Sequence, residues 1–169
     1  MANDKLGLPS QQRKALIRNQ VTNLLWYGKI ETTQARAKSV QREAEKLITI
    51  AIRSYEDTVK AVKTIKDEKG VKADHEVIND GPKKLAARRA IMAYVYDIQE
   101  QRKEKESKAN FKARTKDIKH PLLEKIFNVY APKYDARAKE LGTGGGYTRI
   151  IKLDNRRGDG AQRVIIELV

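Results

Sequence analysis

Two apolar runs around a polar turn end the chain, and they constrain the fold more than any other segment. From Gly144 to Val169 the sequence reads GGGYTRIIKL, then DNRRGDG, then AQRVIIELV. Runs rich in β-branched residues on both sides of a short polar turn are typical of a β-hairpin. The inward face of this hairpin stays open, because Ile151 and Leu153 lie on one side and Ile150 on the other.

The segments before the hairpin have mainly helical periodicity. Pro9 and Ser10 mark a helix start, with Ser10 as the capping residue, and Gly28 ends that helix. Its apolar stripe recurs at helical spacing and consists of Ile17, Val21, Leu24 and Leu25. Residues 29–33 then form a short β-type run.

Three further amphipathic helices are predicted. The second helix begins at a Thr33 cap, reaches about Ser54, and buries Ala37, Val40, Ala44, Leu47, Ile48 and Ala51. The third starts at about Lys84, and its apolar side contains Ala87, Ile91, Tyr94, Val95 and Ile98. The fourth is stopped by Pro132, and its apolar side contains Leu123, Ile126, Phe127 and Tyr130.

Two segments resemble insertions between these helices. In residues 55–84 a weak helical period through Val59, Val62 and Ile65 is broken at Gly70. Residues 99–119 contain almost no apolar side chains, which predicts a protruding charged helix or a disordered loop.

The order of elements predicts the fold class. We expect one domain over residues 1–169, with insertions at about 55–84 and 99–119. The class is α+β, in two layers, with the order α-β-α-α-α-β-β and helical insertions. Because three strands cannot close a barrel, they should form a small mixed sheet packed against the helices.

The charge of the chain indicates a polyanionic partner. Lys and Arg number 36 against 22 Asp and Glu, for a net charge of +14. Nucleic acid is the commonest partner that neutralises such an excess. An anionic membrane is the alternative, but no apolar run approaches spanning length and residues 1–8 lack a secretion signal. The chain has no cysteine, which excludes disulfides, thiolate nucleophiles and cysteine-based zinc sites.

Candidate catalytic groups are few. His75 and His120 lie far apart in the sequence and neither belongs to a base or ligand motif, and Glu43 and Glu45 point to different faces of their helix. The glycines at 142–146 resemble a phosphate loop, but they follow a helix and open a strand, the reverse of a nucleotide-binding loop. We therefore expect no enzyme activity, no small-molecule substrate, no cofactor and no metal.

An RNA-binding surface fits the remaining features best. The basic candidates on the first two helices and the first strand are Arg13, Lys14, Arg18, Lys29, Arg36 and Lys38. The uncharged donors are Asn19, Thr32 and Thr33. The hairpin adds Arg149, Lys152, Arg156, Arg157 and Arg163. We expect Tyr147, beside Arg149, to stack on an unpaired base.

The chain also resembles a known family, the bacterial large-subunit ribosomal protein conventionally numbered seventeen. The resembling motifs, in order, are KLG at 5–7, SxxRKALxRN at 10–19, KIETT at 29–33, AxAK at 35–38, AEKLIT at 44–49, ARR at 87–89, a helix at 123–134, GGYTRIxK at 145–152, RRGD at 156–159 and the terminal IIELV. They cover about two-thirds of the chain. The hairpin matches best.

This resemblance implies a structural constituent of the large ribosomal subunit. Such a protein would bind 23S ribosomal RNA and neighbouring ribosomal proteins, would support translation, and would reside in the cytoplasm within the ribosome. The resemblance adds Lys5, Ser10, Arg88 and Arg89 to the RNA-binding candidates. A free RNA chaperone or nucleoid-type protein would explain the charge but not the ordered motifs, and a phosphate-handling enzyme would lack a base and a metal site.

Overall fold

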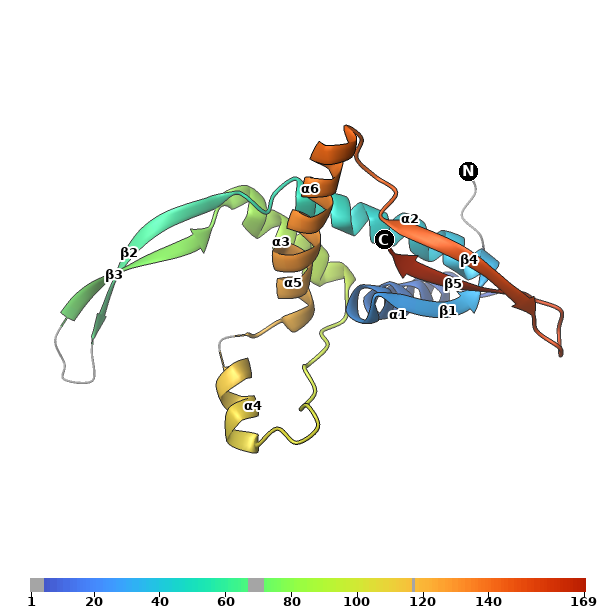
Figure 1. The fold of residues 1–169 in the computed structure, drawn as a ribbon, viewed down its shortest axis with the longest axis horizontal. Helices are drawn as coiled ribbons and strands as arrows, with labels where there is room; N and C mark the ends of the chain where they lie inside the picture. The colour runs from blue at the N-terminus through green and yellow to red at the C-terminus, as the bar shows by residue number, and fades with distance from the viewer. Residues whose placement is uncertain (1–4, 67–71, 117) are drawn as a thin grey trace.

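The computed structural model describes residues 5–66, 72–116 and 118–169, without the side chains of residues 64–75. The elements are α1 (Ser10–Tyr27), β1 (Lys29–Thr33), α2 (Gln34–Ile52), β2 (Thr58–Lys66), β3 (Lys72–Asp80), α3 (Pro82–Tyr94), α4 (Lys108–Thr115), α5 (Pro121–Lys125), the π-helical turn η1 (Ile126–Tyr130), α6 (Ala131–Leu141), β4 (Thr148–Asn155) and β5 (Gln162–Leu168). Figure 1 shows a central body from which two β-hairpins extend at opposite ends and α4 projects below. The α+β class is confirmed.

The central sheet contains three strands in the order β1-β5-β4. Both pairings are antiparallel, so the prediction of a mixed sheet was wrong in this respect. The hairpin prediction is confirmed, and the sheet resolves its inward face. Val164 and Ile166 are fully buried, whereas Ile151 is 40% exposed on the opposite face.

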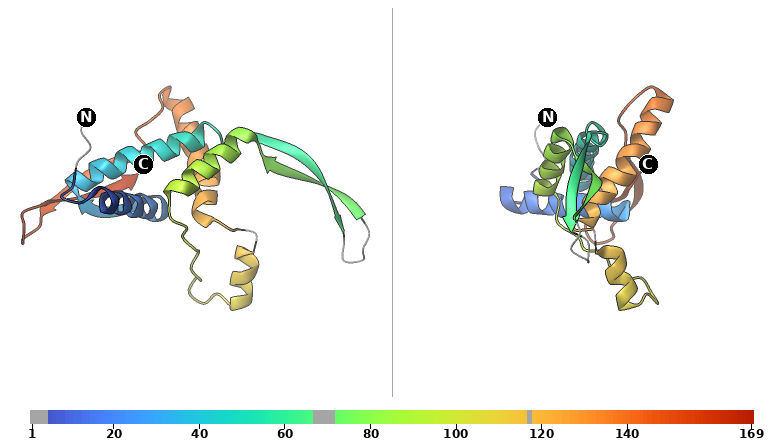
Figure 2. Two further views of the ribbon diagram at one scale, coloured as in Figure 1. Left: turned by 180° about the vertical axis from the view of Figure 1, so that it is seen from behind. Right: turned by 90° about the vertical axis from the view of Figure 1, so that its left-hand side faces the viewer.

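The helices α1 and α2 cover the inward face of this sheet, and α2 also packs against α3, η1 and α6 (Figure 2). All six residues predicted for the buried side of α2 are buried, and so are Val21, Leu24 and Leu25 of α1. Gly28 ends α1 with a left-handed φ of 81°, as predicted. The core therefore lies around α2, and it holds the first half of the chain against the C-terminal hairpin.

Side-chain caps differ from the prediction. Ser10 is the first residue of α1 and Pro9 precedes it, while Thr33 occupies the N-cap of α2, and neither helix has a side-chain cap hydrogen bond. The third helix ends at Tyr94, so Ile98 lies beyond it. The first turns of α1 and α2 contain no acidic residue.

The strands β2 and β3 pair as an antiparallel two-stranded arm, where the sequence predicted a weak helical period. Valine and threonine favour strands because their branched side chains fit a pleated surface, and this preference outweighed the apparent periodicity. The base of the arm is fixed to α3. The carboxylate of Asp57 accepts hydrogen bonds from the backbone N–H groups of Lys83 and Lys84, at 2.8 and 3.3 Å.

Pro132 does not stop the fourth helix. The chain passes from α5 through the π-helical turn η1 into α6, which has Pro132 in its first turn. A proline lacks the N–H that an α-helical hydrogen bond requires, and a local π turn is one way to absorb it. In η1 the N–H of Ala131 bonds to the carbonyl of Ile126, five residues back.

Candidate nucleic-acid interface

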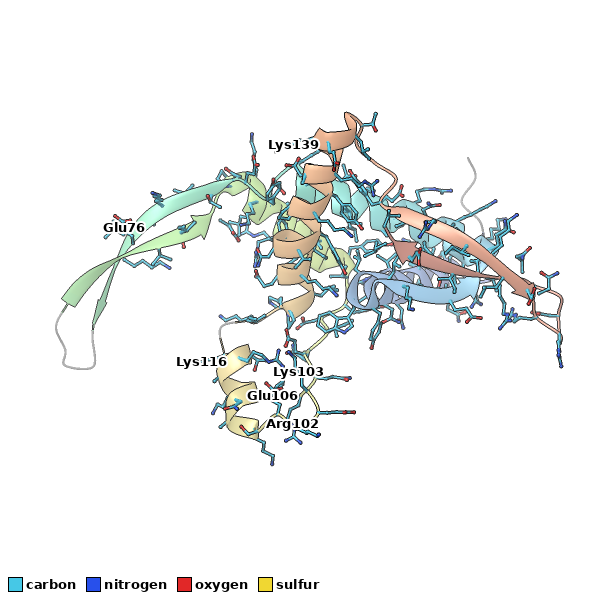
Figure 3. All side chains as sticks on the ribbon, viewed as in Figure 1. Glu76, Arg102, Lys103, Glu106, Lys116 and Lys139 are labelled. Carbon is cyan, nitrogen blue, oxygen red and sulfur yellow. The ribbon has the colours of Figure 1, made fainter. Side chains whose placement is uncertain are left out.

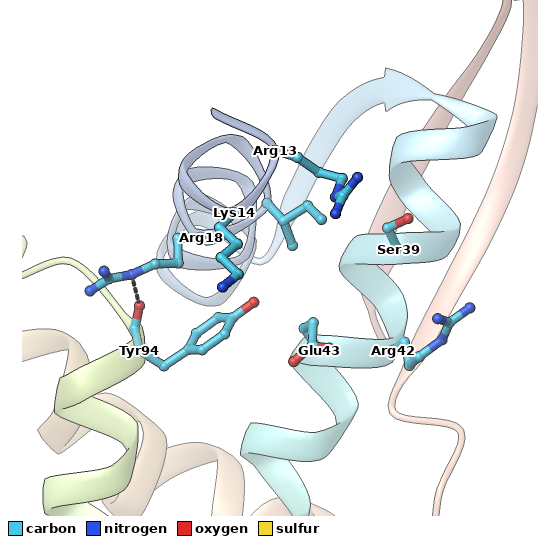
Figure 4. A pocket seen from close by; sticks show the side chains of 8 residues that line it. Arg13, Lys14, Arg18, Ser39, Arg42, Glu43 and Tyr94 are labelled. Atoms are coloured by element: carbon cyan, nitrogen blue, oxygen red, sulfur yellow. Dashed lines mark hydrogen bonds between the residues drawn. The ribbon is translucent and has the colours of Figure 1, made fainter. Parts of the chain in front are cut away.

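A groove of about 360 Å³ lies between α1 and α2 and is closed at one end by α3. Its lining includes Arg13, Lys14, Arg18, Ser39, Arg42, Glu43 and Tyr94. Figure 4 shows Arg13 and Lys14 on the α1 side and Glu43 on the α2 side. Burial raises the pKa of Tyr94 to about 12, so this phenol remains protonated and can donate a hydrogen bond at neutral pH.

Arg18 is held inside this groove by the protein itself. Its guanidinium donates to the carbonyls of Ala93 and Tyr94 at the end of α3, and it stacks 4.6 Å from the centre of the Tyr96 ring. These contacts join α1 to the end of α3. Arg13 and Lys14 are therefore the cations on the α1 side of the groove whose side chains form neither a hydrogen bond nor an ion pair with the described residues.

A second hollow lies where the first turn of α2 meets the turn of the C-terminal hairpin. One part, of about 460 Å³, is lined by Thr33, Arg36 and Arg156, together with Leu6 and Gln162. An adjoining part of about 240 Å³ shares those three residues and adds Thr32 and Arg163. Residues predicted for the RNA surface from separate segments of the chain are thus brought together here.

Several hairpin cations are paired with carboxylates. Arg149 contacts Glu167 at 2.5 Å, Arg156 contacts Asp159 at 2.8 Å, and Arg163 contacts Glu31 at 3.2 Å. Two of these pairs join neighbouring strands, so the sequence does not show them, whereas the pair of Arg156 and Asp159 is local to the turn. Lys152 and Arg157 are exposed and have no ion-pair partner in the part of the chain that the structure describes.

The other predicted residues divide into exposed and internal groups. The exposed cations, which have no ion-pair partner among the described residues, are Lys5, Lys29, Lys38 and Arg89. Ser10 and Asn19 are exposed on α1, and Asn19 accepts a hydrogen bond from Asn23. Thr32 is buried and bonded to Gln20. Arg88 pairs with Asp80 and Glu124 inside the fold, so its predicted RNA contact is replaced by a structural one.

Tyr147 was predicted to stack on a base, but its side chain is only 6% exposed. Its ring centre lies 4.9 Å from that of Tyr134, in the core between α6 and β4. The guanidinium of Arg137, which no sequence pattern indicated, donates to the carbonyls of Gly145 and Gly146 at 2.8 and 2.9 Å. Because these carbonyls accept hydrogen bonds from an arginine of α6, the glycine segment is a structural link between α6 and the hairpin.

Known proteins resemble the chain over nearly its whole length. The sequence model described as Ribosomal protein L17 matches residues 16–169. The chain belongs to the ribosomal protein L17 family. The Large ribosomal subunit protein bL17 of Lachnospira eligens is 40% identical over 184 residues, covering 98% of this chain and 97% of that protein. Proteins of the same name are 36% identical in Acetivibrio thermocellus, over 99% of each chain, and 36% identical in Caldanaerobacter subterraneus subsp. tengcongensis, over the full length of both.

The family resemblance predicted from the motifs is thus confirmed, and in this member of the ribosomal protein L17 family the basic motif RKALIR lines the groove between α1 and α2. The Nδ1 atom of His120 lies 3.3 Å from the Oδ1 atom of Asp97. The side chain of His75 falls outside the described residues. Within the described ranges, no group of three or more His, Cys, Asp or Glu side chains could hold a metal ion. No helix among the described residues is long and apolar enough to cross a membrane.

Proposed function

We propose that this chain is a structural, non-enzymatic constituent of the large ribosomal subunit, and that it binds 23S ribosomal RNA and contacts neighbouring ribosomal proteins. It would support translation and reside in the cytoplasm, within the ribosome. The membership of the ribosomal protein L17 family supports this role, since the relatives bear the name of a large-subunit protein. Their match extends along nearly the entire chain.

One observation carries the RNA-binding part of the proposal: the two basic grooves lie along the same helix. Arg36 of α2 borders the hollow at the hairpin turn, and Ser39 and Glu43 border the groove against α1. These three residues are spaced by three and four positions, so they share one face of α2. From Arg36 to Glu43 the helix rises about 10 Å, so the two grooves follow one another along this face of α2, and together they are called the α2 track.

The beginning of α2 favours an anion at one end of this track. Its first backbone N–H groups receive no side-chain cap, its first turn has no acidic residue, and Arg36 and Arg156 flank it. The partial positive charge of a helix N-terminus and two guanidinium groups then act on the same position. A phosphate of an RNA strand has the charge and the acceptor atoms to occupy it.

The RNA contacts are assigned to the solvent-facing candidates. These are Lys5, Ser10, Arg13, Lys14, Asn19, Lys29, Thr33, Arg36, Lys38, Arg89, Arg149, Lys152, Arg156 and Arg157. Arg18, Thr32, Arg88 and Tyr147 instead support the surface from within, because each is at least partly buried and is also bonded to or packed against another element of the protein.

A free RNA chaperone is the alternative function, and the fractionation of cell extracts on sucrose gradients distinguishes the two. We expect the tagged chain to sediment with the large subunit and to remain there at a salt concentration that strips loosely bound proteins. Its absence from the large-subunit peak would overturn the proposed ribosomal role.

A further inference from the structure

The short helix α4 presents two chemically different faces. Phe111, Arg114 and Thr115 are partly buried, while Lys108, Lys112 and Lys116 are exposed. At about 100° per residue, the three lysines lie within about 80° of one another, opposite Arg114. The helix stands away from the body of the protein, and Figure 3 labels Lys116 on it and Glu106 in the loop before it. The exposed lysine face is therefore open to a partner.

Two carboxylates of this appendage, those of Glu100 and Glu106, are drawn to the other face. Arg114 pairs with Glu106 at 3.1 Å and also with Glu100, and the backbone N–H of Lys103 donates to Glu106 at 3.0 Å. These contacts attach α4 to the loop that precedes it. They also remove two negative charges from the neighbourhood of the lysine row.

The lysine row has no internal purpose that the structure reveals. Among the described residues, no carboxylate forms an ion pair with Lys108, Lys112 or Lys116. Like charges four residues apart destabilise a helix, which offsets the favourable position of Lys112 in the last turn of α4. The helix persists because Ser107 caps it, accepting from the N–H of Asn110 at 3.1 Å, and because Arg114 ties it to the loop.

The chemistry of this face fits a phosphate backbone better than a protein. Stable protein interfaces have an apolar or aromatic centre and few lysines. Ala109 and Ala113, beside the lysines on the helix, are exposed and small, so a strand can approach the helix closely. A row of three cations with about 6 Å between successive members suits a chain of phosphates.

We propose that Lys108 and Lys112 of α4, together with Lys116 at its C-cap, bind the phosphate backbone of RNA, as a second contact separate from the track along α2. This inference rests on the proposed function, because the RNA would belong to the large subunit. It assigns to the segment 99–119 the role of an outlying clamp. The segment would hold a second strand at a distance from the body of the protein.

The first test compares the binding of purified full-length variants to 23S ribosomal RNA across a series of KCl concentrations. The K108Q/K112Q/K116Q variant should reduce the slope of log affinity against log salt by about three, one for each phosphate that the variant no longer neutralises. The K108R/K112R/K116R variant is the matched control and should retain the slope, since arginine keeps the charge and the helix propensity. An unchanged slope in the glutamine variant would overturn the proposal.

The second test identifies the partner directly. Because the chain has no cysteine, Lys112→Cys and Arg157→Cys each provide one thiol for a short azidophenacyl crosslinker. In assembled large subunits, irradiation should link both variants to 23S ribosomal RNA. RNA crosslinks from position 157 alone would refute the inference and leave the proposed function standing. Crosslinks from position 112 to protein only would also refute it, and RNA crosslinks from neither position would contradict the proposed function itself.

Discussion

Arginine has two separate roles in this chain, and the number of fixed acceptors around each side chain determines which one it takes. Arg18, Arg88 and Arg137 reach backbone carbonyls or carboxylates of distant elements. The planar guanidinium suits this role because it offers several donors in a rigid arrangement. Arg36 and Arg157 find no such acceptors among the described residues, so their charges remain available to a partner.

Buried phenols make the stability of the protein sensitive to alkali. Burial raises the pKa of Tyr94 and of Tyr130 to about 12, from 10 in the unfolded chain. Below pH 10 both states keep the proton, but between pH 10 and 12 the unfolded state loses it first. The free energy of unfolding should therefore fall across this range, by up to about 2–3 kcal/mol for Tyr130 and by less for Tyr94, which is partly exposed at the groove.

Tyr130→Phe tests this directly by urea denaturation at several pH values. The variant should lose about 1 kcal/mol near neutral pH, because the hydroxyl donates to the carbonyl of Leu25 at 2.9 Å. Its further loss between pH 10 and 12 should be smaller than that of the parent. Tyr27→Phe, at a ring that is 66% exposed, is the control for the absence of one phenol. If the free energies of unfolding of Tyr130→Phe and of the parent fall in parallel between pH 10 and 12, the alkaline loss does not come from the Tyr130 phenol.

Site residues were predictable from the sequence to the extent that their partners are local. Arg13, Lys14 and Arg36 were selected by their charge and helical position, and the structure brings them to the grooves along α2. Tyr147 was misplaced because its burial depends on Tyr134 and Arg137, which reach it across the glycine segment. A sequence shows the charge or aromatic character of a side chain, but its exposure depends on tertiary contacts.

At the scale of elements, periodicity identified the helices that face the core and failed for the parts that do not. The apolar stripe of α2 predicted its buried face correctly, since α2 packs against the sheet and against α1, α3, η1 and α6. The arm of β2 and β3 has no such face: Val62 and Ile78 are 66% and 69% exposed. Without one-sided burial, neither the helical nor the strand period appears clearly in the sequence.

Asp57→Ala should loosen the joint between the arm and α3, where the Asp57 carboxylate caps the first turn of α3 beside the ion pairs of Asp80 with Lys84 and Arg88. The variant removes the acceptor for the N–H groups of Lys83 and Lys84, which costs about 1 kcal/mol for a typical helix cap. Asp57→Asn keeps an acceptor oxygen and should lose less, since only the attraction between the charge and the helix dipole disappears. Hydrogen exchange would measure the effect, with faster exchange of the Lys83 and Lys84 amides in the alanine variant. Unchanged exchange of those amides would show that the cap contributes nothing.

For the whole molecule, the position of the charge matters more than its total. The net charge of +14 indicates a polyanion, but it does not show which cations face it. In the structure, Arg156 borders the hollow that joins the hairpin to α2, and Arg157 lies in the same exposed turn. Lys103 and Lys105 lie instead in the loop before α4, outside both the α2 track and the lysine row of α4.

This difference predicts unequal effects from equal losses of charge. Arg156→Ala with Arg157→Ala, and Lys103→Ala with Lys105→Ala, each remove two positive charges, so long-range attraction to RNA falls by the same amount in both. The arginine variant should also bind fewer phosphates at the start of α2, and its incorporation into large subunits should fall further.

Binding of the parent chain provides the scale: with six to ten phosphates neutralised, affinity for 23S ribosomal RNA should drop by about 10³–10⁵ between 50 and 200 mM salt. The arginine variant should reduce that salt dependence, whereas equal losses of incorporation in both variants would show that net charge, and not the track along α2, controls assembly.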